Sequence, residues 1–126
     1  MAIESDIVNY LLAQSEITDV VSERVYPTQL PENSELPALM YIRIGGNRMR
    51  THRGHSQSAT SLQISCWSKS YGEAKYLSDM LIEKLDNYDG YMQSGRVTIF
   101  HQNDRDIYEP DTGLYHIPVD FEIHYE

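Results

Sequence analysis

The sequence predicts an α+β fold of two layers: an antiparallel β-sheet with two α-helices packed on one face and a long basic β-hairpin loop. Three observations predict it. Apolar and polar residues alternate in segments 38–44, 60–67 and 115–125, the period of strands with one buried face. Two other segments, near residue 3 and after residue 70, have apolar residues at helical spacing. A long polar stretch separates the first two alternating segments.

The first 30 residues are expected to form a helix, a short helical turn and a strand. Four apolar residues fall at helical spacing: Ile3, Ile7, Tyr10 and Leu11. Residues 15–21 are predicted as a second short helical turn, with Ser15 as its cap. Residues 24–30 are predicted as a strand, which Pro27 confines to an edge or an end because proline has no N–H to donate.

The central hairpin joins strands predicted at 38–44 and 60–67. Gly45 and Gly46 are expected to weaken or bulge the first strand. The loop is predicted over 47–58, far longer than the usual two to five residues of a hairpin connection. A loop of this length and basic character is expected to be mobile or functional.

The best helix of the sequence follows the hairpin. Ser70 and Glu73 have the spacing of a capping box. The apolar stripe consists of Ala74, Leu77, Leu81, Leu85 and Tyr88. Asp89 and Gly90 are expected to end the helix.

The C-terminal third reads as strands and turns. Residues 97–101 and 107–108 are predicted as strand, broken by the polar segment 102–106. Residues 109–113 have the composition of a turn, with Pro110 fixing one dihedral and Gly113 accepting a positive φ. The clearest strand is 115–125.

Composition favours one soluble domain over residues 1–126, since 40% of the residues are hydrophobic and 23% are charged. No apolar run approaches the length of a membrane span, and the first residues make a poor signal peptide. The single cysteine, Cys66, excludes an intrachain disulfide, fits a reducing compartment and is expected to be an inert core thiol.

The net charge of −9 is unevenly distributed. No acidic residue occurs between Glu35 and Glu73, a window that carries five cations, whereas the rest of the chain is strongly acidic. The predicted oligomer or partner-interface residues lie in the loop of this window: Arg48, Arg50, His52, Arg53 and His55. Arginine binds phosphates and carboxylates alike. The loop therefore reaches DNA phosphates, pairs with an acidic patch on a neighbouring subunit, or is a solvated tip; the acidity of the rest favours a protein partner.

A second candidate interface is aromatic. Tyr41 and Trp67 are predicted side by side on the second face of the sheet, the one without helices. An exposed apolar patch there would mark an interface; the alternative is that loops close this face as well.

No residue is predicted to be catalytic, to ligate a metal or to bind a cofactor. The acidic cluster of Asp104, Asp106, Glu109 and Asp111 lacks the order of a calcium loop, and Arg105 suggests local pairing. Two histidines on a glycine-containing loop are too few for a structural zinc site. No nucleophile elbow, P-loop or dinucleotide fingerprint is present.

Several short phrases, in order and at these spacings, point to a family. They are RVYP at 24–27, LPALMY at 36–41, QISCW at 63–67, SYGEA at 70–74 and DRDIYEPDTGLY at 104–115. Together they resemble the tail-completion, or tail-to-head joining, proteins of long-tailed bacteriophages, which include tail terminators.

The resemblance implies a small α+β virion-assembly protein of phage or prophage origin with no enzyme activity. Such proteins form a homo-oligomeric ring, typically a hexamer, at the head-proximal end of the tail tube. The ring ends tube growth and joins the tail to the head connector, and DNA passes through its lumen. The implied partners are other copies of itself, the tail tube protein and the head connector or completion protein, without a membrane. The implied location is the virion, at the head–tail junction, after assembly in the bacterial host cytoplasm.

Three other roles stay open at this point. The chain is a head-side connector or completion protein, a small nucleic-acid-binding module that uses the window from Arg43 to Arg53, or an enzyme or ligand-binding domain of the host. The second predicts steep salt dependence of DNA binding, and the third predicts a pocket with convergent polar groups.

Overall fold

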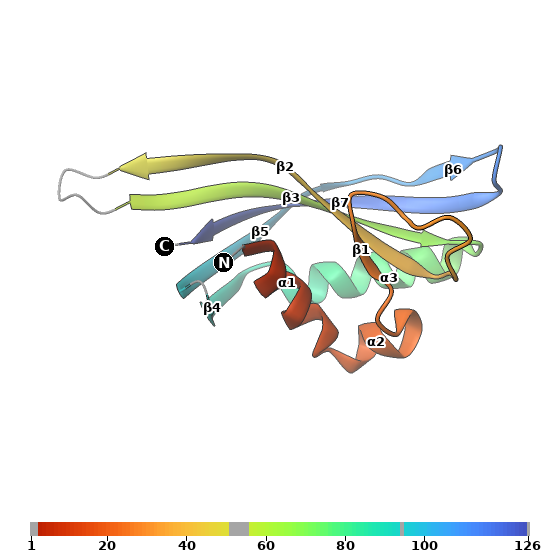
Figure 1. Cartoon of the computed structure of the whole chain (residues 1–126), viewed down its shortest axis with the longest axis horizontal. Helices are drawn as coiled ribbons and strands as arrows, with labels where there is room; N and C mark the ends of the chain where they lie inside the picture. The colour runs from red at the N-terminus through yellow and green to blue at the C-terminus, as the bar shows by residue number, and fades with distance from the viewer. Residues whose placement is uncertain (1–2, 51–55, 94, 126) are drawn as a thin grey trace.

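The computed structural model describes residues 3–50, 56–93 and 95–125, with the backbone alone at 46–50 and 56–58. Two helices come first, and β-strands follow with one further helix inserted among them (Figure 1). The elements are α1 (Ile3–Leu12), α2 (Ser15–Val21), β1 (Val25–Pro27), β2 (Ala38–Arg50), β3 (Ser56–Ser68), α3 (Tyr71–Leu85), β4 (Tyr88–Met92), β5 (Gly95–Asp104), β6 (Ile107–Glu109) and β7 (Leu114–Tyr125). The predicted α+β class is confirmed, with three helices rather than two because residues 15–21 form a helix of their own.

All described strands belong to one sheet, in the order β1-β2-β3-β7-β5-β4, with β6 paired to β7 beside β5. Neighbouring strands are antiparallel except for β1, which runs parallel to β2 through three residue pairs. The prediction of a purely antiparallel sheet is therefore wrong at β1. As expected for a strand that contains Pro27, β1 lies at an edge.

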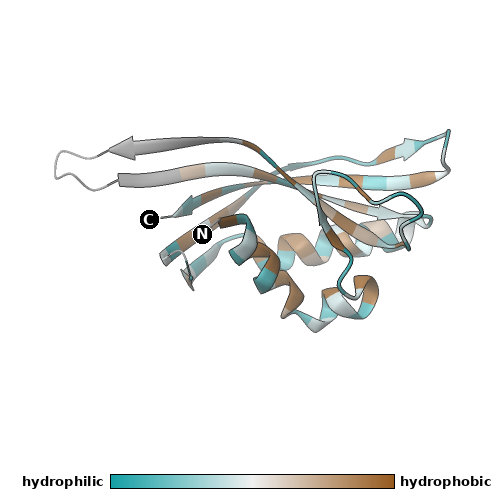
Figure 2. Cartoon of the chain, viewed as in Figure 1, coloured by the Kyte–Doolittle hydropathy of each residue, from teal (hydrophilic) through white to brown (hydrophobic). Residues whose placement is uncertain are grey.

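The three helices lie on the same side of the sheet (Figure 1), and the brown, apolar segments of Figure 2 include α1, α3 and the strands beside them. The core is formed by residues that alternate inward along the strands and face the helices. Its largest fully buried side chains include Phe121, Leu62, Ile64, Leu77 and Leu81. Cys66 is fully buried, as predicted, and burial raises the pKa of its thiol, so it behaves as an apolar core residue.

The start of α3 confirms the predicted capping box, with one change. The Ser70 Oγ accepts a hydrogen bond from the Glu73 N–H at 3.3 Å. The Glu73 carboxylate does not reach back to the Ser70 N–H directly. It accepts instead from the Ser68 hydroxyl at 2.7 Å, and the Ser68 Oγ accepts from the Ser70 N–H at 3.0 Å. Ser68 thus links the last residue of β3 to the first turn of α3.

The end of α3 differs from the prediction. The helix stops at Leu85. Tyr88, predicted in its apolar stripe, and Asp89 and Gly90, predicted to end it, belong to β4. Asn87 adopts a left-handed φ of 63°, which asparagine tolerates well, and its N–H donates to the Ile99 carbonyl at 2.9 Å. This single residue turns the chain from the helix into the sheet.

The α2 cap also differs from the prediction. Gln14 occupies the N-cap position, and Ser15 is the first helical residue. The Ser15 hydroxyl donates to the Glu16 carboxylate, so it does not cap the helix.

Two predicted breaks in the sheet are strand instead. β5 runs through residues 102–104, and the hairpin strands continue through much of the predicted loop 47–58, as far as Arg50 and from Ser56. Polar residues are acceptable in these strands because backbone hydrogen bonds, not side-chain burial, hold the ladder. The predicted irregularity at the glycines is confirmed: the register shifts between Arg43 and Gly45, which leaves Ile44 as the extra residue of a bulge.

Candidate assembly surfaces

The β2–β3 hairpin extends past the helical layer of the molecule (Figure 1). Arg48 and Arg50, two of the predicted interface residues, lie in β2, where they pair with Ser58 and Ser56 of β3. The other three, His52, Arg53 and His55, lie outside the described residues. β3 also pairs with β7 from Ser58 to Ser68, so among the described residues only the end of the hairpin, beyond Arg48 and Ser58, is two-stranded. Arg48 and Arg50 lie at this end of β2.

Past Tyr41, one side of β2 has no strand neighbour among the residues that the structure describes. β1 pairs only with residues 39–41, and the last bond of this edge runs from the Thr28 N–H to the Tyr41 carbonyl at 2.8 Å. Beyond Tyr41, every strand pairing described for β2 is with β3. A hollow of about 260 Å³ opens where β1 ends, lined among others by Thr28, Ile42 and Arg43. Here the side chains of Ile42 and Ile44 are 37% and 57% exposed.

Tyr41 and Trp67, predicted as neighbours, lie on opposite faces of the sheet. Tyr41 is opposite Ile64 and packs against the core, whereas Trp67 is opposite Ala38 and three residues along β3 from Ile64. The prediction is wrong for Tyr41, because side chains directly opposite each other share a face and alternate residues change face.

Trp67 stacks instead on His116, with ring centroids 4.1 Å apart and ring planes 10° apart. The His116 Nε2 lies 3.1 Å from the Glu109 carboxylate, and the imidazole side chain is 15% exposed. Burial is the main reason why the pKa of His116 is lowered, and Arg105 adds to this while Glu109 opposes it. The Trp67 Nε1 and the His116 Nδ1 are buried without a hydrogen-bond partner among the described residues. The sheet face that carries no helices is therefore partly covered at this end by residues of loops and strands.

The acidic cluster makes local contacts rather than converging on one point. The Asp104 carboxylate lies 3.0 Å from the His101 Nε2. The Tyr71 hydroxyl donates to Asp106 at 2.7 Å, and this bond raises the pKa of Tyr71. The expected pairing with Arg105 is replaced by these partners. Within the described ranges, no group of three or more His, Cys, Asp or Glu residues is placed to hold a metal ion.

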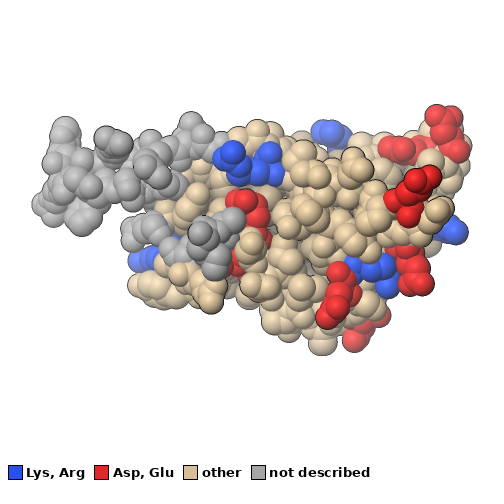
Figure 3. All heavy atoms as spheres, viewed as in Figure 1, with Lys and Arg blue, Asp and Glu red and all other residues tan. Residues whose placement is uncertain are grey.

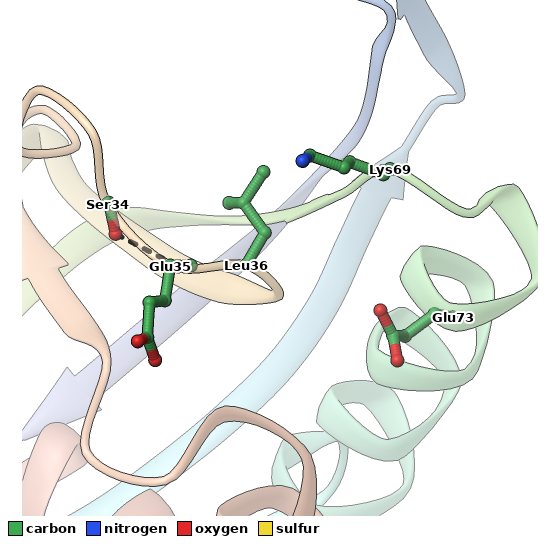
Figure 4. A pocket seen from close by; sticks show the side chains of 5 residues that line it. All are labelled: Ser34, Glu35, Leu36, Lys69 and Glu73. Atoms are coloured by element: carbon green, nitrogen blue, oxygen red, sulfur yellow. Dashed lines mark hydrogen bonds between the residues drawn. The ribbon is translucent and has the colours of Figure 1, made fainter.

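A hollow of about 480 Å³ lies between the chain before β2 and the start of α3. Figure 4 shows Glu35 and Leu36 on one side, and Lys69 and Glu73 on the other. Glu35 is largely exposed and lies 3.6 Å from Arg24, while Glu73 is held by Ser68. The hollow therefore has charged walls but no paired nucleophile and base among the side chains that line it.

Charge is distributed unevenly along the molecule. Acidic side chains gather at the end that carries β6 and the turn after it (Figure 3). The sequence places the arginines of β2 at the other end, toward the hairpin tip. No helix of the described residues is long and apolar enough to cross a membrane.

The model of a family described as Tail completion protein gp17 matches residues 5–126, nearly the whole chain. The chain belongs to this family. The resemblance predicted from the sequence is thereby confirmed, and the protein has a structural role in the tail of a virion.

Comparison with solved structures agrees with the fold. A chain of the virion of a native gene transfer agent (GTA) particle is similar, with a TM-score of 0.77 and 14% sequence identity over 99% of this chain and 95% of that chain. A second solved chain, for which no function is named, has a TM-score of 0.65 and 11% identity over 99% of this chain and 91% of its own. No curated protein matches the sequence.

Sequence reasoning missed the most distinctive feature of these surfaces, the bare edge of β2. The only signal for it was the shortness of the strand around Pro27, which leaves most of β2 without an outer neighbour.

Proposed function

We propose that this tail completion protein forms a homo-oligomeric ring, typically a hexamer, at the head-proximal end of the tail tube. The ring ends tube growth and joins the tail to the head connector, and DNA passes through its lumen. Its partners are its own copies, the tube protein and the connector or completion protein of the head. The chain acts by binding alone and catalyses no reaction.

The observation that carries the proposal is the end of the β2–β3 hairpin, which extends past the helical layer of a chain that belongs to a tail completion family (Figure 1). Most of β2 lies opposite residues of β3 that also pair with β7, and the hairpin leaves the wider sheet only beyond Arg48. This end of the hairpin extends toward a neighbour in a small ring. Its arginines supply charge opposite to the acidic remainder of the chain.

A passage for DNA is consistent with the overall charge. A chain with a net charge of −9 repels phosphates on average, so duplex slides past it without being held tightly. The basic residues of the hairpin are then better suited to a protein partner than to DNA.

The match to a tail completion family supports a protein that acts by binding. The one thiol is fully buried with its pKa raised, which disfavours the nucleophilic thiolate. The charged residues of the largest hollow described are engaged with Arg24 and Ser68 or exposed to solvent.

The test is complementation of a particle that lacks this gene by the variant Arg48→Ala/Arg50→Ala/Arg53→Ala. We expect a folded protein, unjoined heads and tails, and a loss of infectious or gene-transferring particles. The control Lys69→Ala removes an exposed cation from the body and is expected to complement normally. Normal complementation by the hairpin variant would count against the role of the hairpin, and steep salt-dependent binding of duplex DNA by the isolated protein would favour a nucleic-acid-binding module instead.

A further inference from the structure

We propose that the bare edge of β2, residues 42–50, adds as a strand to the acidic edge of a second copy, residues 102–111, which include the end of β5, β6 and the start of the turn after β6. The contact would continue the sheet of one subunit into the next. This inference rests on the proposed ring and names the surfaces that build it.

The basic edge has backbone groups without a strand partner in the described part of the chain. Among the residues that the structure describes, 42–50 have a strand neighbour only on the β3 side, so the outward N–H and C=O groups are available for a further strand. The segment carries three arginines and no acid, and Arg43 is exposed. Ile42 and Ile44 add exposed apolar surface. The hollow at the end of β1 leaves room for an incoming strand in line with β1.

The acidic edge lies on the opposite side of the same sheet. β4 covers β5 only as far as Ile99, and the His101 N–H is occupied by the Asp86 carboxylate, so the uncovered run begins at Gln102. Residues 102–111 carry four acids and one arginine, a net charge equal and opposite to that of residues 42–50. Phe100, just before this run, and Tyr108, within it, are 45% and 52% exposed.

Charge decides which edges pair. Two β2 edges would place arginines against arginines, and two acidic edges would place carboxylates together; both arrangements are unfavourable. The remaining edge strand, β4, has its Asp89 already bound to Arg96 by two hydrogen bonds of 3.1 Å, so it offers β2 little charge. The basic edge therefore fits the acidic edge of another copy.

The two edges belong to opposite sides of one sheet, so every copy offers one of each. Such a contact is heterologous, and it repeats from copy to copy until it closes into a ring. The bulge at Ile44 divides the basic edge into two short runs, which limits pairing with unrelated strands.

The experiment uses two charge-reversed variants of the full chain. The first, Arg43→Glu/Arg48→Glu, makes both edges acidic, and the second, Asp106→Lys/Asp111→Lys, makes both edges basic. Neither is expected to assemble alone, whereas an equimolar mixture is expected to assemble because unlike edges alternate. Mass is measured by light scattering in the presence of purified tail tubes and without them. The control Asp19→Lys/Glu23→Lys changes charge equally on exposed residues in and next to α2 and is expected to assemble as wild type does.

Hydrogen exchange separates strand addition from side-chain docking. In the assembled wild type we expect the amides of 42–50 to exchange at least about tenfold more slowly than in the monomer. Unchanged exchange, wild-type assembly by each variant alone, or a folded mixture that stays monomeric would overturn the edge pairing while leaving the ring in place. A wild-type chain that forms no ring even on tail tubes would refute both proposals.

Discussion

Ser68 is predicted to hold the junction between β3 and α3, and its replacement tests how the sequence builds this part of the body. Ser68→Ala removes the hydroxyl that donates to Glu73 at 2.7 Å and accepts from the Ser70 N–H at 3.0 Å. Each of these hydrogen bonds contributes a net of about 1 kcal/mol to the free energy of unfolding. Because Ser68 is fully buried, water does not replace the lost hydroxyl. The expected loss is about 2 kcal/mol of unfolding free energy.

The corresponding change in melting temperature follows from chain length. At about 2.1 cal/mol/K per residue, 126 residues give an unfolding entropy of about 0.26 kcal/mol/K, so the midpoint should fall by about 8 °C. Ser70→Ala removes only the cap bond to Glu73 and should lower the midpoint by about 4 °C, for a loss of about 1 kcal/mol. Circular dichroism during heating measures both. The reasoning is refuted if Ser68→Ala melts no lower than Ser15→Ala, which alters only an exposed hydroxyl.

Three further predictions concern the core and its titrating groups. Leu81→Ala, at a fully buried position of α3, should lower the free energy of unfolding by about 2–5 kcal/mol, measured by urea titration. A smaller loss than that of Glu83→Ala, at an exposed position, would contradict the burial of Leu81 in the core. The pKa of His116 is lowered by folding, so the unfolded chain binds the proton more readily and stability should fall as pH drops below about 6.5. In His116→Phe, which keeps an aromatic ring on Trp67, this part of the pH dependence should disappear. Urea titrations of both proteins at about pH 7.5 and about pH 5.5 measure the difference. Cys66 should resist a thiol reagent in the native state and react only as fast as the protein unfolds, and rapid stoichiometric labelling of the folded chain would show that its burial is wrong.

The parts of the fold that could be predicted are those in which a local pattern has one physical meaning. The alternation of residues 115–125 predicts β7, and Ser70 with Glu73 predicts the start of α3. The turn with Gly113 at a φ of 74° was predictable because the left-handed region favours glycine.

The errors come from features that depend on distant partners. Tyr88 continues the apolar stripe of α3, and only the left-handed backbone of Asn87, fixed by a bond to β5, shows that the helix has ended. Both faces of β2 are apolar at residues 39–42, so alternation alone could not assign Tyr41 to the core; its pairing with Ile64 does. The polar ends of β2 and β3 looked like loop because sequence patterns report burial, whereas backbone pairing extends these strands.

The candidate surfaces divide in the same way. The excess of arginine in the window after Glu35 was evident from the sequence. The bare edge that carries it, and the acidic edge on the other side of the sheet, required the strand order, which is a property of the whole chain.

The most direct test of the central claim is electron microscopy of purified tail tubes mixed with this protein. The account predicts added density at one end of each tube only, in the form of a ring, and no further tube growth from that end. Decoration along the whole tube, or tubes that bind no protein at either end and keep growing, would contradict it.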